Sequence, residues 1–200
     1  MSGLIRSLRF RVRRGWVGGT LALLLSSPAV AHMPAVLKTE HVIERPEISW
    51  ALYGRFVSGD EVYRLKGTYE KPFALPFEML VPHRDDHRRF RPRFAVVAAG
   101  LPEPTTAERE ALPKPLPAGQ GALVELNDDP DRLVVFESVL RRMYWSSTPI
   151  ALPVPAGPFE IWIWNPDRTS GDFTFALGVE EDFGGGGAAG VFDDWGTYAY

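Results

Sequence analysis

Two stretches near the end of the chain are apolar at every second position, and this pattern constrains the fold more than any other. They are residues 159–164 and 173–179, whose alternating apolar side chains are Phe159, Ile161, Ile163, Phe173, Phe175, Leu177 and Val179. A period of two places such side chains on one face of a β-strand. Asn165-Pro166-Asp167 between the stretches favours a turn, so the two stretches predict a β-hairpin.

Shorter runs of branched and aromatic residues predict further strands at 47–57, 62–65, 73–81, 94–99, 122–126 and 133–136. Pro72, Pro76 and Pro82 each lack a main-chain donor, so the strand at 73–81 is expected at a sheet edge or interrupted. Only the capping-box spacing of Thr105 and Glu108 predicts a helical turn or two. The fold class is therefore all-β: a single β-sandwich, jelly-roll-like domain.

Residues 1–31 have the layout of a cleaved signal peptide. A basic stretch with five arginines precedes an apolar stretch, and Ala29-x-Ala31 supplies the small residues that a signal peptidase accepts. The apolar stretch is shorter than the ~20 residues that cross a bilayer. Cleavage would leave His32 as the new N-terminus, and the mature protein is expected to be periplasmic or secreted, without a membrane span.

The rest of the chain is expected to form one domain with two appendages. Residues 32–45 are an N-terminal extension, 46–183 the β-sandwich, and 184–200 a C-terminal tail. The tail opens with four glycines, which are typical of a flexible tether. Beyond them, the aromatic residues expected to dock on the domain or on a partner are Phe192, Trp195, Tyr198 and Tyr200.

Charge and cysteine content exclude several classes of protein. Of the 22 Lys and Arg, five lie in the signal peptide, which leaves 17 against 25 Asp and Glu, a net charge of −8 with His neutral. An acidic surface repels nucleic acid, so the expected partner is a protein or a carbohydrate. The chain has no cysteine, which excludes disulfides, thiol catalysis and thiolate metal sites.

His32 is the candidate metal ligand with the clearest chemistry. A histidine at a processed N-terminus offers its α-amine and its ring Nδ1 to one ion, and one further histidine would complete a three-nitrogen site suited to Cu(II). The second ligand would be His83, His87 or His41. This layout resembles lytic polysaccharide monooxygenases and some periplasmic copper carriers, and the alternative is that His32 merely follows the cleavage site.

Two other groups of residues could bind a ligand. Arg88, Arg89 and Arg91 belong to an arginine cluster that could hold a phosphate, a sulfate or an acidic sugar, or could form a solvated loop with local ion pairs. If Phe159, Ile161 and Ile163 face the core, Trp162 and Trp164 share the opposite face, where they could stack on a sugar or a partner, or could be buried by a covering loop.

A calcium loop is not expected at Asn127, Asp129 and Asp131. Their spacing suits one, but Arg132 and Ser138 stand where such a loop needs glycine and glutamate, so an Asx-rich turn is predicted. The chain has no nucleophile elbow, no His-Glu-x-x-His motif and no phosphate-binding loop. An enzyme is therefore not the favoured interpretation, and no cofactor is expected unless the copper hypothesis holds.

Three segments carry a family resemblance. They are Pro46-Glu47-Ile48-Ser49 with Ala51-Leu52-Tyr53-Gly54, then Phe90-x-Pro92 with Gly100-Leu101-Pro102, and Gly157-Pro158-Phe159-x-Ile161 through Gly171-Asp172-Phe173-Thr174-Phe175. Together they resemble uncharacterised exported β-sandwich proteins similar to the pre-peptidase C-terminal domains of secreted bacterial enzymes. The resemblance implies a jelly-roll-like fold and a non-catalytic binding or accessory role, and it carries over no catalytic residue.

Overall fold

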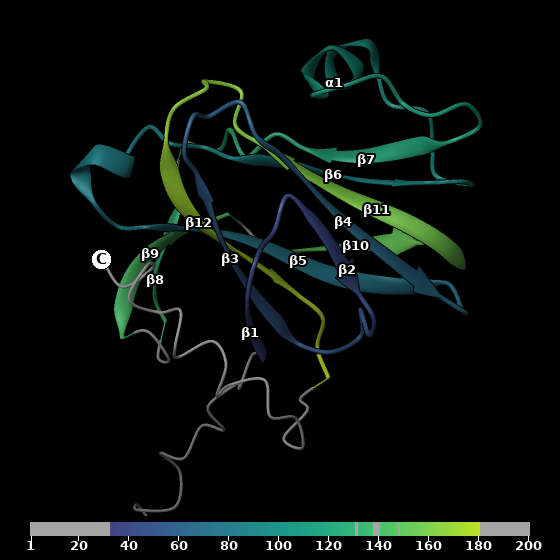
Figure 1. Ribbon diagram of the computed structural model, residues 1–200, viewed down its shortest axis with the longest axis horizontal. Coiled ribbons are helices and arrows are strands. Elements are labelled where there is room, and N and C mark those ends of the chain that lie inside the picture. Colours follow the sequence, from purple (N-terminus) through teal and green to yellow (C-terminus); the bar gives the residue numbers. More distant parts are fainter. Residues whose placement is uncertain (1–32, 131, 138–140, 148, 181–200) are drawn as a thin grey trace, which may run out of the picture.

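The protein forms a β-sandwich of two sheets, seen in a computed structural model that describes residues 33–130, 132–137, 141–147 and 149–180 (Figure 1). The expected all-β fold is confirmed. The signal peptide at 1–31, His32 and the tail at 184–200 lie outside the described residues.

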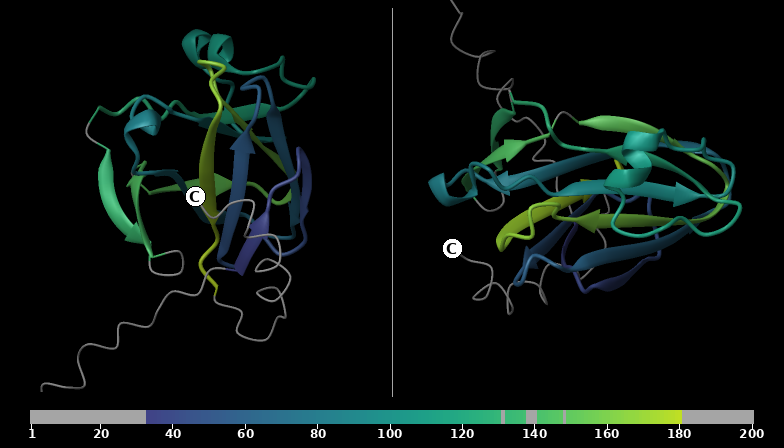
Figure 2. Two further views of the ribbon diagram at one scale, coloured as in Figure 1. Left: turned by 60° about the vertical axis from the view of Figure 1, so that its left-hand side comes forward. Right: turned by 90° about the horizontal axis from the view of Figure 1, so that it is seen from above.

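Sheet A has seven strands. Its order is β1 (Met33–Val36), β3 (Trp50–Phe56), β12 (Gly171–Leu177), β5 (Phe73–Pro82), β9 (Arg142–Ser146) and β8 (Leu133–Glu137), and β10 (Ile150–Val154) also pairs with β5. Figure 2 shows the β8–β9 hairpin at one side of the molecule and the first strands of the chain at the other.

Sheet B has five strands. Its order is β2 (Glu40–Ile43), β4 (Val62–Tyr69), β11 (Gly157–Trp164), β6 (Arg93–Ala98) and β7 (Gly121–Glu125). Two short helices complete the described part of the chain, η1 (Asp85–His87) after β5 and α1 (Thr106–Ala111) after β6. Neither is long or apolar enough to cross a membrane.

The core lies between the sheets and is rich in phenylalanine. Phe94 of sheet B contacts Phe77 and Phe175 of sheet A at ring-centroid distances of 5.7 and 5.0 Å. A Cβ on Gly54 would lie 2.3 Å from the ring of Phe173. The glycine in β3 therefore leaves room for this ring. Burial of these large rings supplies most of the apolar area that stabilises a fold without disulfides.

The predicted β-hairpin at 159–179 is wrong, although both strands exist. β11 pairs with β4 and β6 in sheet B, whereas β12 pairs with β3 and β5 in sheet A. The turn at Asn165-Pro166-Asp167 therefore crosses from one sheet to the other. Alternation defines which face of a strand is buried but does not define its neighbour, because a sandwich offers the same buried face to strands of either sheet.

The strand at 73–81 was expected at an edge or interrupted; the edge position is wrong, but the pairing along one side of the strand is interrupted between β10 and β9. β5 is an interior strand whose partners change along its length: β10 pairs with Phe73–Phe77, β12 with Phe77–Leu80 and β9 with Leu80–Pro82. Pro76 and Pro82 fall outside the part that pairs with β12. Because these prolines lie outside that part, their lack of an N–H removes no hydrogen bond between β5 and β12.

The expected N-terminal extension is part of the sandwich. Met33–Val36 pairs in parallel with β3, and Glu40–Ile43 pairs in parallel with β4, so one short segment adds an edge strand to each sheet. The described sandwich therefore includes residues 33–43, which precede the expected start at residue 46. The sequence did not predict these strands, because each has only four residues and a period-two pattern of that length is too short to recognise.

The connection from β6 to β7 covers the outward face of sheet B. It contains α1, whose capping box is formed as expected: Thr105 Oγ1 accepts from the Glu108 N–H, and the Glu108 carboxylate accepts from the Thr105 N–H at 2.7 Å. Leu112 and Leu116 of this connection pack against Trp162. Figure 1 shows α1 beside β7 at one end of this sheet.

Candidate anion-binding site

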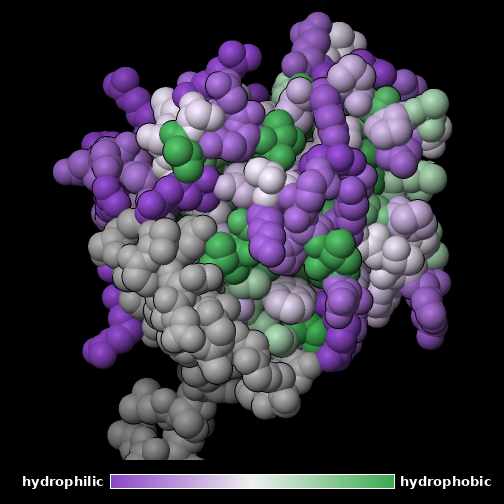
Figure 3. All heavy atoms as spheres, in the orientation of Figure 1, coloured by the Kyte–Doolittle hydropathy of each residue, from purple (hydrophilic) through white to green (hydrophobic). Residues whose placement is uncertain are grey.

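The arginine cluster lies on the loop that follows β5, and one buried ring anchors that loop. Phe90 is 4% exposed and packs edge-on against Phe56 at a centroid distance of 6.0 Å. Because Phe90 points inward, its neighbours Arg88 and Arg89 remain at the surface, where both are exposed. Figure 3 shows hydrophilic side chains gathered at the left of the view, where Figure 1 places the loop that contains η1.

A buried histidine ties this loop to sheet A. His87 is 6% exposed, and its Nε2 accepts the main-chain N–H of Asp172, the second residue of β12, at 3.0 Å. A main-chain N–H only donates, so Nε2 is the acceptor and Nδ1 carries the proton that faces Asp86 Oδ1 at 2.9 Å. Both nitrogens have partners within the protein, so no described contact favours His87 as a metal ligand.

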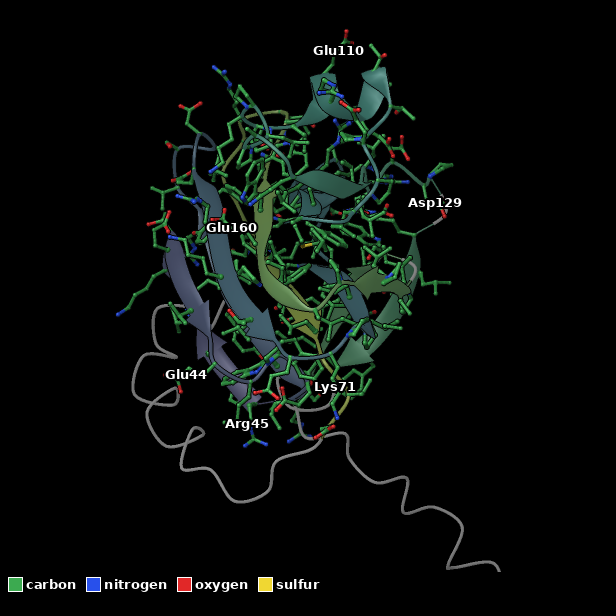
Figure 4. The ribbon with its side chains drawn as sticks, turned by 90° about the vertical axis from the view of Figure 1, so that its right-hand side faces the viewer. Glu44, Arg45, Lys71, Glu110, Asp129 and Glu160 are labelled. Atoms are coloured by element: carbon green, nitrogen blue, oxygen red, sulfur yellow. The ribbon has the colours of Figure 1, made fainter. Side chains whose placement is uncertain are left out.

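Two guanidinium groups of the cluster are fixed by main-chain carbonyls. Arg91 donates to the carbonyl oxygens of Asn127 and Asp129 at 3.2 and 2.5 Å. Arg132 donates to those of Phe90 and Arg88 at 3.1 and 2.6 Å. These bonds join the loop after β5 to the turn between β7 and β8, where Figure 4 labels Asp129 at the edge of the molecule. The acceptors that the described residues offer to both side chains are neutral carbonyls, which do not compensate the charge.

Trp145 of β9 forms a platform beneath the cluster. The guanidinium carbon of Arg132 lies 4.7 Å from the centre of the indole ring, and the ring of His83 lies 4.5 Å from it. Such cation–π contact holds a guanidinium in place without neutralising it. His83, expected as a metal ligand, therefore stands beside cations in the described structure.

The arginines surround a hollow of about 490 Å³, lined by Arg88, Arg89, Arg91, Pro130, Arg132 and Trp145. No carboxylate belongs to this described lining. No described residue pairs with the guanidinium of Arg88 or Arg89, whereas nearby Arg84 is paired with Asp86. The hollow therefore presents unpaired guanidinium donors, which match the geometry of phosphate, sulfate and carboxylate oxygens.

The electrostatics of the hollow favour an anion. Burial, together with the like charge of Arg91, lowers the pKa of Arg132 to about 10. The group remains protonated at neutral pH, so the protein carries the cost of a partly desolvated cation beside another cation. An anion in the hollow would remove that cost, which is a physical reason for favourable binding.

The expected exposed face of Trp162 and Trp164 does not exist. These side chains are 0% and 5% exposed, buried under the connection from β6 to β7. Trp162 donates its Nε1–H to Glu160 Oε2 at 2.7 Å, and Lys114 Nζ lies 4.3 Å from the ring centre. The sequence carried a weak signal for this cover in Leu112 and Leu116, two apolar residues within an otherwise polar, proline-bearing connection.

The copper hypothesis stays untested, because His32 lies outside the described residues. Within the described residues no three acidic or histidine side chains form a metal-binding group.

The turn between β7 and β8 supports the hollow through Asn127. Asn127 is 3% exposed and adopts the left-handed conformation with a φ of 51°, which asparagine tolerates well. Its side chain donates to the Pro92 carbonyl at 2.9 Å, and its main chain accepts from Arg91. Sequence reasoning singled out Arg88, Arg89 and Arg91 but missed Arg132 and Trp145, because long-range contacts bring them to the cluster.

Comparison with known proteins finds similarity among solved structures only. No protein-family model matches the chain, and no curated protein sequence matches it. Among solved structures it is similar to the pre-peptidase C-terminal domain of collagenase from Bacillus anthracis, with 7% sequence identity and a TM-score of 0.36. The match covers 69% of this chain and 93% of that domain. This is the group of domains that the sequence motifs resemble.

Proposed function

We propose that this chain is an exported, non-enzymatic binding protein that holds an oxyanion group of its ligand in the arginine hollow. The observation that carries the proposal is the convergence of four arginines on one hollow whose described lining residues include no carboxylate. Arg91 and Arg132 are held in place by the main chain, and Arg88 and Arg89 can turn toward the ligand. Pre-organised donors lose little conformational entropy on binding.

The ligand chemistry follows from the donors. Guanidinium groups form paired hydrogen bonds to planar or tetrahedral oxyanions, so the group recognised is a phosphate, a sulfate or a carboxylate. Trp145 already contacts His83 and Arg132, which favours a supporting role for this ring over stacking on a sugar. The proposed determinant is therefore the anionic group of a carbohydrate or protein partner.

Calorimetry on the full mature chain tests the proposal. Phosphate, sulfate and an oligomer of galacturonate are titrated separately, and at least one is expected to bind one-to-one with an affinity that falls as salt rises. Arg88→Gln with Arg89→Gln should weaken binding about 10- to 100-fold, because a hydrogen bond to a charged group contributes about 1.5–3 kcal/mol. Arg168→Gln is the matched control, since that exposed arginine pairs with Asp60 elsewhere on the surface.

The outcomes separate specific from general charge effects. Equal weakening by the double variant and the control would mean that only the overall charge attracts the anion. Absence of binding by all three probes contradicts the proposed function. Copper binding through His32 stays the alternative hypothesis, and no described contact favours it.

A further inference from the structure

Several side chains on the outward face of sheet A, the face that points away from the core, are buried. Along β3, β12, β5 and β9, alternate side chains point opposite to core residues such as Leu52 and Phe175. Their apolar members define what we call the outer patch: Ala51, Tyr53, Leu80, Tyr144 and Ala176. Each is only 3 to 8% exposed. Outward side chains of a sandwich are normally in contact with water, so their burial needs an explanation.

The outer patch is continuous across the middle of the sheet. Ala176 is opposite Ala51, and Thr174 is opposite both Tyr53 and Leu80. β9 extends the patch further, because Pro82 of β5 is opposite Tyr144. On the same outward face, Ala151 and Pro153 of β10 are exposed. Burial is therefore local to four adjacent strands and is not a general property of this face.

The described neighbours of the two tyrosines in the outer patch include polar groups: Thr174 forms a hydrogen bond with Tyr144, and Glu137 of β8 lies near both Tyr53 and Tyr144. On sheet B the outward Trp162 is covered by the connection from β6 to β7, and Leu112 and Leu116 belong to the resulting cluster. By contrast, neither of the two hydrophobic clusters that the described residues form includes Tyr53, Leu80 or Tyr144. Burial also raises the pKa of Tyr144 to about 12, as expected for a phenol removed from water.

The chain leaves the described structure at the rim of the outer patch. The Ser49 N–H donates to the Glu180 carbonyl at 2.8 Å, directly before β3 and after β12, the two strands that carry Ala51 and Ala176. Phe192 follows Glu180 by twelve positions, and an extended chain of that length reaches about 40 Å. Four strands are only about 15 Å across, so residues 191–200 can reach every part of the patch.

The composition of residues 191–200 suits this surface. They include Phe192, Trp195, Tyr198 and Tyr200, four aromatic side chains in ten residues. Aromatic rings bury large apolar areas at a small cost in conformational entropy, and the phenol and indole groups keep a polar atom for the rim. The signal peptide is the other undescribed end, but its expected cleavage removes residues 1–31 from the mature protein.

We propose that residues 191–200 dock on the outer patch of sheet A of their own chain. The docked segment forms a third layer over β3, β12, β5 and β9, as the connection from β6 to β7 does over sheet B. This inference does not depend on the proposed anion site, whose lining shares no residue with the patch.

Crosslinking between engineered cysteines tests the proposal directly, because the natural chain has none. Ala176→Cys is combined with Ala199→Cys, which preserves all four aromatic residues, and mild oxidation is followed by mass spectrometry. A disulfide within one molecule is expected. The matched control combines Ala199→Cys with Thr68→Cys, an exposed position on the outward side of β4. Equal crosslinking in both pairs, or no crosslinking in the first, overturns the proposal.

Disulfides found only between molecules would also overturn it, since the segment would then dock on a second copy or an open partner surface. A second measurement does not depend on cysteine chemistry. In the full chain with Phe192, Trp195, Tyr198 and Tyr200 replaced by Ser, the nitration rate of Tyr144 should rise roughly tenfold, equivalent to about 1.4 kcal/mol of lost docking free energy. Thr197→Ala should leave that rate unchanged, and an unchanged rate in the serine variant contradicts the proposal.

Discussion

Nε2 of His87 accepts the main-chain N–H of Asp172 at 3.0 Å, and this contact joins the loop after β5 to the start of β12. The carboxylate of Asp172 lies on the same side, with Oδ2 at 3.7 Å from Nε2. One histidine therefore contacts both a donor and an acceptor of the same residue, and its protonation state decides which of them it uses. The contact also holds the loop that carries Arg88 and Arg89.

Stability should depend on pH through His87. Asp172, as the main cause, raises the pKa of His87 above its usual value, and Asp86 adds to the rise while burial opposes it. Because the folded-state pKa is above the unfolded value, the stabilisation is complete below about pH 6.5 and is lost as the pH rises through the folded-state pKa. His87→Gln should therefore lower the free energy of unfolding more at about pH 5.5 than at about pH 8.5.

Urea unfolding at both pH values measures this difference. His41→Gln is the control, because burial, with Lys38 as a second cause, lowers the pKa of His41. A lowered pKa gives the opposite sign: its contribution is present at high pH and is lost as the pH falls. A pH-independent effect of His87→Gln would contradict the assignment.

Trp162→Ala should destabilise the fold strongly rather than impair ligand binding. The ring is fully buried, and its removal leaves a cavity under Leu112 and Leu116, with an expected loss of about 3–5 kcal/mol. Denaturant unfolding checks this value. Leu133→Ala, at a position 54% exposed on β8, should change stability by less than about 0.5 kcal/mol. A loss under about 1 kcal/mol for Trp162→Ala would show that the connection from β6 to β7 does not bury the ring.

Gly171→Ala should destabilise the protein because the added methyl group would overlap the ring of Phe90. A Cβ at this position would lie 2.8 Å from the Phe90 ring, and such overpacking costs about 1–3 kcal/mol. Phe90→Leu shortens the side chain and should make the alanine substitution less costly. A double-mutant cycle measured by thermal unfolding gives the coupling between the two sites, and additive effects would show that the loop moves aside freely.

Trp145 should act as a positioning residue for Arg132. Trp145→Ala removes the ring that the guanidinium contacts, and a cation–π contact contributes about 0.5–2 kcal/mol, so anion affinity should fall severalfold. Trp145→Phe keeps an aromatic face and should restore most of that affinity. If the two variants bind the anion equally well while only stability changes, Trp145 has a purely structural role.

The copper hypothesis makes a separate prediction about the processed terminus. Intact mass should show cleavage directly before His32, and calorimetry should show tight one-to-one binding of Cu(II) that disappears in His32→Ala. His87→Ala should leave the copper affinity unchanged, since both ring nitrogens of His87 already have partners. A mature terminus at any other residue would contradict the hypothesis.

Sequence patterns predicted the strands better than their arrangement. Alternation located β11 and β12 but assigned them to one hairpin, because the period of two reports only the face that is buried. The runs that became β9 and β10 were not recognised; each is a five-residue strand that includes exposed positions such as Met143 and Ala151. Such strands form through pairing with β5, a long-range interaction that local residue order does not reveal.

The candidate site was predictable in part for a similar reason. Arg88, Arg89 and Arg91 are adjacent in sequence, so their density was visible. Arg132 joins them only because it donates to the carbonyl of Arg88, which lies 44 residues earlier in the chain. The burial of Trp162 depended on a cover more than forty residues away. Both missed features are tertiary contacts between segments that lie far apart in the sequence.

The position of β11 and β12 has a consequence for how the molecule is made. They are the last two described strands, yet β11 lies in the middle of sheet B and β12 lies between β3 and β5 in sheet A. During synthesis, which starts at the N-terminus, both incomplete sheets therefore have unpaired strand edges until the chain has been made as far as Leu177. Folding of this kind is slow and prone to aggregation, because nearly every contact that closes the domain is non-local. Under the proposed export, slow closure would keep the polypeptide unfolded during its passage through a translocation channel.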